Sequence, residues 1–263
     1  MDGASVRADA WPRAAEDEGG NVKSGVRRAV AAAAVVAALG VTTACGGSSE
    51  TTDDAKKPAA SEKTTAPAKP AEEGAKALTA AELEKAVVAT GDVKGYKVEK
   101  VGKDDLPPTE SVAAKPASCQ PLADMFMFST QPTAKDRVVR TLMATDELDP
   151  KVTSLALLAH DGADAAKVMK DLRTASKSCT AYEHVDYKYS GVKERPAPDA
   201  GDEAVSYDVK GVIDGDKVPM TFTVVRSGST VVAFYTMNML DSSKTDVPQV
   251  IVDAQLAKLE KTV

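Results

Sequence analysis

The chain has 263 residues, long enough for one folded domain with additional segments or for two small domains. It carries 39 acidic and 33 basic side chains, a net charge of −6, and it has no dense run of lysine and arginine. We therefore expect no nucleic-acid partner, because nucleic-acid binding depends on clustered positive charge.

Residues 22–44 resemble a bacterial lipoprotein signal peptide that ends before Cys45. A positively charged segment at 23–28 precedes an apolar stretch, Ala29–Val41, which is shorter than the roughly 20 residues that a membrane span needs. Small residues stand directly before Cys45, as signal cleavage requires. We expect Cys45 to be lipidated and to become the first residue of the mature chain. The alternative is an ordinary signal peptide cut nearby, with Cys45 left as a free thiol.

The segments on either side of the signal peptide are not expected to fold. Residues 1–21 place acidic side chains ahead of the positive segment, so the simplest interpretation is a start-site artefact, with translation beginning at Val22. Residues 45–77 nearly lack large apolar side chains and cannot offset the entropy cost of ordering. We interpret them as a disordered tether that spans roughly 30 Å. The predicted location is the extracytoplasmic face of the cell membrane, where a lipid anchor holds the protein.

The folded domain is expected at 78–263. It opens with a capping box, Thr79 and Glu82, at the start of a helix. The spacing of apolar residues then predicts, in chain order, a helix at 79–90, a strand at 95–101, a short helix from 121, strands at 137–145 and 152–160, a helix at 161–179, strands at 205–210, 218–226 and 230–239, and a helix at 246–261. Because the clearest strand pairs are joined by tight turns, the predicted fold class is α+β, a single domain in which an antiparallel β-sheet packs against helices.

Two further cysteines, Cys119 and Cys179, lie on apolar stripes of predicted helices. In a chain that is exported to an oxidising compartment, such a pair predicts a disulfide. The alternatives are two buried free thiols or a pair of metal ligands. No histidine or further cysteine stands at ligand spacing, so we expect no metal site.

Several features together resemble the extracellular sensor domain of PknH-type serine/threonine kinases of mycobacteria, and actinobacterial lipoproteins that carry this domain without a kinase. They are Cys119 before a short helix, Cys179 at the end of a long one, GDEAVSY opening a strand, the hairpin VVRSGSTVVAFY, and a helix after Pro248. The resemblance covers 78–263 and implies an antiparallel sheet with helices that form a cleft for an unidentified ligand. The kinase domains use two disulfides, whereas this chain can form one.

No enzyme signature stands out from the sequence. The only histidines, His160 and His184, are too few for most acid–base or zinc chemistry, and the common nucleophile, zinc-protease and phosphate-loop motifs are absent. Ser190 and Lys193 match the S-x-x-K pattern of penicillin-binding enzymes, but the partner motifs S-D-N and K-T-G do not occur. The segment around them is predicted to be a loop, and we expect no catalysis there.

Two other patterns remain open to more than one interpretation. Asp214 and Asp216 have the spacing of calcium ligands but lack the remaining ligands of an EF-hand, which favours a solvated hairpin turn. The run Met125–Phe128 cannot turn all its large apolar side chains inward from one helix face. It is interpreted as the edge of the core, with the rim of a cleft or a partner patch as the alternative.

The sequence therefore predicts a membrane-anchored extracytoplasmic lipoprotein whose domain is a non-catalytic sensor or ligand-binding module without a cofactor. Its expected partners are the membrane, through the lipid anchor, and an unidentified small ligand or envelope protein. The alternative is a structural cell-envelope lipoprotein that binds another protein, and the third interpretation is an enzyme of unrecognised type.

Overall fold

The computed structural model describes residues 75–148, 150–213, 215–238 and 240–262. The expected start-site artefact, signal peptide and lipidated Cys45 lie outside the described residues, as does the expected tether up to residue 74. Ala75 and Lys76, the first two described residues, contact the rest of the domain directly. The carbonyl of Ala75 accepts a hydrogen bond from the backbone N–H of Gly162, and that of Lys76 accepts one from the Ser229 hydroxyl.

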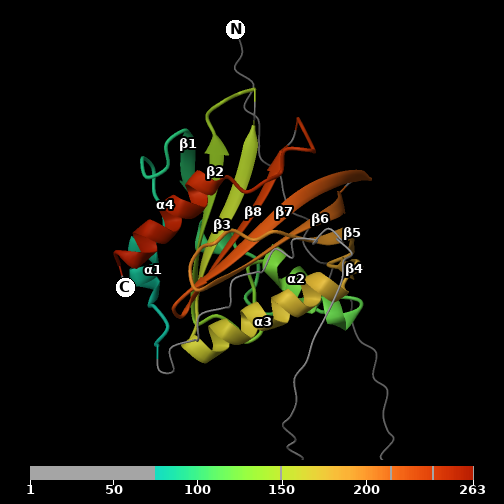
Figure 1. Ribbon diagram of the computed structural model, residues 1–263, viewed down its shortest axis with the longest axis horizontal. Coiled ribbons are helices and arrows are strands. Elements are labelled where there is room, and N and C mark those ends of the chain that lie inside the picture. The colour runs from blue at the N-terminus through green and yellow to red at the C-terminus, as the bar shows by residue number, and fades with distance from the viewer. Residues whose placement is uncertain (1–74, 149, 214, 239, 263) are drawn as a thin grey trace, which may run out of the picture. The chain divides into compact units, whose positions relative to one another are not determined.

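Eight strands of the described residues form one antiparallel sheet in the order β1-β2-β3-β8-β7-β6-β5-β4 (Figure 1). The strands are β1 (Tyr96–Lys100), β2 (Asp136–Ala144), β3 (Lys151–Ala159), β4 (Ala181–His184), β5 (Tyr187–Arg195), β6 (Glu203–Ile213), β7 (Asp216–Ser227) and β8 (Thr230–Asn238). Neighbours in the sheet are mostly neighbours in the chain. The exception is β3, which pairs with β8 and so places the C-terminal meander beside the N-terminal strands.

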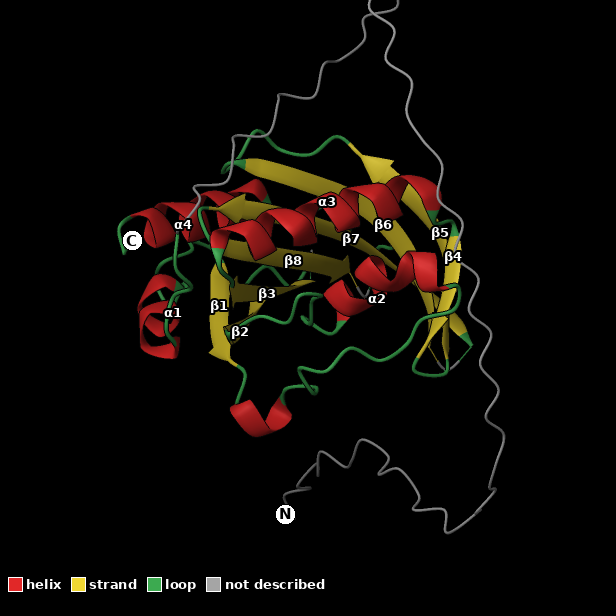
Figure 2. Cartoon of the chain, turned by 90° about the horizontal axis from the view of Figure 1, so that it is seen from below, coloured by secondary structure: helices red, strands yellow, loops and turns green. Residues whose placement is uncertain are grey.

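The helices are α1 (Ala80–Ala86), α2 (Gln120–Phe126), α3 (Gly162–Ser178) and α4 (Gln249–Glu260), with short 3-10 turns η1 (Lys103–Asp105) and η2 (Ala117–Cys119). Because successive side chains of a strand point to opposite faces, the sheet contributes to two cores. Ala233 packs in the core with α2 and α3, whereas the next residue, Phe234, packs in the core with α1 and α4. Figure 2 shows α2 and α3 lying across one face, and α1 and α4 beside the β1 end of the sheet.

The predicted fold class is confirmed as a single α+β domain with an antiparallel sheet. The capping box is present as well: the Glu82 N–H donates to the Thr79 hydroxyl, and the Thr79 N–H donates to the Glu82 carboxylate. The last helix begins at Gln249 rather than at residue 246, because Pro248 stands in extended geometry at its N-cap.

The prediction of a loop around Ser190 was wrong, because this segment belongs to strand β5. The sequence pattern is broken by a β-bulge between Ser190 and Lys193, where Gly191 adopts a left-handed conformation with φ 65°. The bulge shifts the alternation by one residue, so a strict period of two is not visible in the sequence. Residues three apart in a strand lie about 10 Å apart, too far for Ser190 and Lys193 to act as nucleophile and base.

Candidate ligand pocket

A hollow of the described domain lies between the segment 103–110 and the segment 128–137. Its volume is about 400 Å³, which falls in the range of small-molecule sites. Leu106, Pro107 and Pro108 contribute apolar surface from the first segment. The second segment follows α2 directly and supplies Phe128, three hydroxyl side chains and Arg137, the second residue of β2. We call this hollow the Arg137 pocket.

Arg137 connects the two walls of the pocket. Its Nη1 donates to the carbonyl oxygens of Met127 at 3.3 Å and Phe128 at 3.2 Å, at the C-terminal end of α2. Its Nη2 donates to the carbonyl oxygen of Pro107 on the opposite wall. These bonds use three of the five N–H groups of a guanidinium, so two remain available for a further acceptor.

No carboxylate of the described residues forms an ion pair with Arg137. Burial lowers the pKa of its guanidinium, and the charge of Glu110 acts in the opposite direction. An arginine nevertheless stays protonated at any physiological pH. The pocket therefore contains a half-buried positive charge whose hydrogen bonds go only to neutral carbonyl groups.

The other charged residues of the lining leave the pocket slightly positive. Lys103 and Lys135 line it together with Glu110 and Asp136. Lys135 lies 3.5 Å from the carboxylate of Asp161, a pair in which both side chains are more than half exposed. Such an exposed pair contributes little binding energy, so the lysine remains able to turn toward a bound anion.

Phe128 shapes the inner end of the pocket and has an unusual backbone. It is a large residue with φ 50°, in the left-handed region that non-glycine residues seldom occupy. This conformation reverses the chain directly after α2 and brings the carbonyls of residues 127 and 128 toward Arg137. Its ring is 6% exposed and stacks on Tyr235 with the ring centres 5.4 Å apart.

The run Met125–Phe128 accordingly divides between the core and the pocket. Met125 is fully enclosed beneath α2, and Phe126 lies half-buried against Tyr189 and Tyr235, with ring centres 5.6 Å apart in both pairs. Phe128 lines the pocket. The run is thus the edge of the core, as predicted, and its last residue also forms the wall of a hollow.

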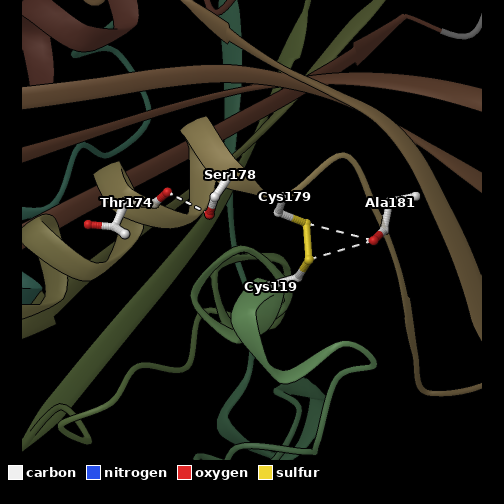
Figure 3. Close-up of a disulfide and its surroundings, with 5 residues drawn as sticks. All are labelled: Cys119, Thr174, Ser178, Cys179 and Ala181. Atoms are coloured by element: carbon white, nitrogen blue, oxygen red, sulfur yellow. Dashed lines mark hydrogen bonds between the residues drawn. A yellow bond between two sulfur atoms is a disulfide. The ribbon is translucent and has the colours of Figure 1, made fainter.

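A second hollow of about 220 Å³ lies between α2 and α3. Cys119, the N-cap residue of α2, forms a disulfide with Cys179, the C-cap residue of α3, with the two Cα atoms 5.5 Å apart (Figure 3). The pair of cysteines expected to be oxidised is therefore joined in the structure. The two sulfur atoms lie 3.6 and 3.8 Å from the carbonyl oxygen of Ala181, at the start of β4. Both cysteines are buried.

A network of polar side chains fixes α2 to the segment that precedes it. Asp124 is 2% exposed and accepts hydrogen bonds from the Ser111 hydroxyl and from the Gln120 amide at 2.8 Å. Burial raises the pKa of this carboxyl group, although the hydrogen bonds oppose the effect. His184 also lies close enough for its charge to interact with Asp124, but burial lowers the pKa of the imidazole. The network has no hydroxyl–imidazole contact that would activate Ser111 as a nucleophile.

The histidine and aspartate residues that the sequence analysis considered do not line this pocket. His160 is fully buried behind a lining residue, Thr130, with its Nε2 3.3 Å from the threonine hydroxyl. Asp214 lies outside the described residues, and Asp216 is exposed at the start of β7. Within the described part of the chain, no three histidine, cysteine or acidic side chains are arranged to hold a metal ion. Among the same residues, no helix has the length and apolar character of a membrane span.

Sequence reasoning did not identify Arg137 as a pocket residue. The sequence places it at the start of a predicted strand, where an arginine is ordinarily a solvated end residue. Its partners at Pro107 and Met127 come from segments without regular periodicity, so their approach depends on the tertiary fold. The signal available was the pair of proline-containing segments on either side of a short apolar helix, which indicated loops but not their proximity.

The sequence matches no protein-family profile and no curated protein. Among solved structures, the fold is similar to the extracellular domain of PknH from Mycobacterium tuberculosis, with a TM-score of 0.46 and 8% identity over 72% of this chain and 98% of that one. An uncharacterized protein from Mycobacterium smegmatis matches with a TM-score of 0.35 and 14% identity, over 69% of this chain and 94% of that one. LpqN of M. tuberculosis, which is involved in cell envelope biogenesis, matches with a TM-score of 0.24 and 16% identity, over 64% of this chain and 82% of that one. The similarity is one of structure at low sequence identity, and it includes the domain type that the sequence resembles.

Proposed function

We propose that the protein is a membrane-anchored extracytoplasmic lipoprotein whose domain binds a small ligand in the Arg137 pocket without transforming it. The observation that supports ligand binding is the half-buried guanidinium that faces a 400 Å³ hollow and has no carboxylate partner among the described residues. A ligand with a carboxylate or phosphate group suits this site, because both groups accept paired hydrogen bonds from a guanidinium. One lining hydroxyl, that of Thr130, lies 3.3 Å from Nε2 of His160, but the other ring nitrogen, Nδ1, has no hydrogen-bond partner among the described residues. The imidazole thus lacks the third group that orients the base in a catalytic triad, which supports a non-catalytic role.

The lipid anchor at Cys45 is part of the same proposal. It is supported by the sequence alone, and Cys45→Ala is its test. The variant should be released from the membrane or remain as an unprocessed precursor, because acyl chains supply about 0.8 kcal/mol per buried CH₂ and no described helix replaces them. Unchanged membrane retention of a processed Cys45→Ala chain would contradict the anchor.

Native mass spectrometry of the domain purified from its own host tests ligand binding. We expect a small molecule to accompany the native chain and to be absent from Ala134→Leu, which fills the pocket from a partly buried lining position without touching Arg137. Lys170→Leu on the exposed side of α3 is the matched control and should retain the ligand. A bound molecule that survives Ala134→Leu would place binding elsewhere on the chain.

One observation favours the alternative role, binding of another envelope protein. Leu148 and Leu240 are 89% and 74% exposed, and they lie on two loops at the same end of neighbouring strands, since Lys151 pairs with Asn238. Single exposed apolar side chains are ordinary, whereas apolar side chains that adjoin one another form the kind of patch that marks a protein contact site. Replacement of both by Ser should abolish co-purification of a protein partner and leave any small ligand bound, which separates the two roles.

A further inference from the structure

Helix α4 covers only part of its face of the sheet, and the uncovered part carries a group of lysines. Figure 1 shows α4 in front of β2 and β3, whereas β5 and β4 lie at the other side of the sheet. On the uncovered part, the residues that point away from α3 include four exposed lysines from three strands: Lys188 and Lys193 of β5, Lys210 of β6 and Lys217 of β7. We call these four residues the lysine face.

The strand register brings the four lysines together. Lys188 and Lys217 both pair with Val212, so they flank the same residue of β6. Lys210 lies two residues before Val212 on that strand, and Lys193 pairs with Asp208, two residues further back. With strands about 4.8 Å apart and about 3.4 Å per residue, the four Cα atoms lie within roughly 17 Å of one another. Half-buried Val212 lies between them.

The lysine face is not balanced by acidic neighbours. The acidic side chains of described residues near these lysines are Glu183, Asp208 and Asp246, the last from the segment before α4. Glu183 lies 3.9 Å from Lys188, whereas Arg195 binds both Asp208, at 3.1 Å, and Asp246. Lys193, Lys210 and Lys217 have no ion pair with a described residue, although the chain as a whole has a net charge of −6.

Protection of a sheet edge does not account for this arrangement. Lysines often stand on edge strands, where they prevent pairing with another chain. The edge here is β4, whereas Lys210 and Lys217 belong to interior strands with a neighbour on both sides. An exposed face of an antiparallel sheet is polar, but nothing in sheet geometry requires an excess of positive charge on it.

We propose that the lysine face binds the anionic surface of a lipid membrane. The surface is formed by strands rather than by a concave site, so it suits an extended layer of headgroups, and the half-buried Val212 and Pro219 lie level with the lysine stems. The proposal rests on the proposed Cys45 anchor in one respect, the location of the domain. A tether between Cys45 and the start of the domain at Ala75 would keep the domain near the membrane surface. The lysine face would then hold the domain against that surface.

Vesicle binding by the chain from residue 45, with Cys45→Ser to remove the anchor, tests the proposal. Binding to vesicles of phosphatidylglycerol and phosphatidylcholine is compared with binding to phosphatidylcholine alone at about 0.15 M salt. Each lysine near an anionic surface contributes about a fivefold gain in affinity, so Lys→Gln at all four positions should weaken binding roughly 10² to 10³-fold. Lys→Arg at the same positions should retain it.

A matched control removes the same charge from exposed lysines elsewhere: Lys85, Lys94, Lys170 and Lys261, all changed to Gln. This control should lose less than about threefold. An equal loss of vesicle affinity in both quadruple variants would overturn the proposal. A native chain that binds vesicles with and without phosphatidylglycerol equally well would also overturn it. Binding to soluble polyphosphate without binding to vesicles would overturn it in favour of a polymeric anion. Ala134→Leu should leave vesicle binding unchanged, so a failure of the pocket proposal remains distinguishable.

Discussion

Loss of the disulfide should destabilise the domain by a predictable amount. The bond joins residues 60 positions apart, so the double variant Cys119→Ala, Cys179→Ala releases a loop of that length in the unfolded chain. The chain-entropy relation gives a loss of about 4 kcal/mol for such a loop. A domain of this size loses about 2–4 °C in Tm per kcal/mol, so the melting temperature should fall by roughly 8–16 °C.

Denaturant and thermal unfolding of the native and double-variant chains measure this loss. The variant should be indifferent to dithiothreitol, whereas the native chain should move toward the variant's Tm when reduced. Thr79→Ala, which removes the α1 capping box, provides a scale of about 1 kcal/mol on an element far from the bond. Two alkylatable thiols in the oxidised native chain, or a double variant that melts within about 1 °C of it, would refute the entropic reasoning.

Two other predictions concern buried ionisable side chains. Burial lowers the pKa of His160 to about 4, below the ordinary value of 6.5, so the unfolded chain gains a proton first as pH falls. The free energy of unfolding should therefore have its full value above pH 6.5 and fall by about 3 kcal/mol between pH 6.5 and 4. Urea unfolding measures it, and in His160→Gln the free energy of unfolding should depend much less on pH over this range. Glu203 accepts from Arg226 at 2.7 Å and from Arg173 of α3 at 2.8 Å. Because Glu203→Ala leaves the buried Arg226 with less compensation, it should cost about 3–5 kcal/mol in the same assay, and a cost under about 1 kcal/mol would show that Asp202 suffices.

Most elements could be predicted from the sequence because their apolar residues follow a regular period. Helix α3 keeps its buried positions, such as Ala165, Val168 and Leu172, at the spacing of a helical stripe. Strand β6 likewise alternates buried Tyr207 with polar residues. The β4–β5 hairpin was missed because the bulge at Gly191 interrupts its period and because Val185 occupies a turn position with φ 49°, which β-branched residues seldom adopt.

The candidate pocket depends on contacts that no local pattern encodes. Its walls are two largely irregular segments, whose regular parts are only the 3-10 turn η1 and the start of β2, and their separation is set by hydrogen bonds from Arg137 to carbonyl groups. Every residue has a carbonyl group, so the acceptors leave no signature in the sequence. The lysine face is hidden for a related reason, because its members are scattered over 30 residues and the bulge changes the side on which Lys193 lies.

The position of α2 links the disulfide to the pocket. A helix of seven residues is too short to be stable by itself, so it depends on what holds its ends. Cys119 ties the N-cap to α3, and Arg137 binds the carbonyls of residues 127 and 128 at the other end. Phe128 follows the helix directly and lines the pocket, so any movement of α2 moves that wall. The bond and the guanidinium therefore act on the same short element from opposite ends, and a reduced chain that is still folded should bind its ligand more weakly than the oxidised one.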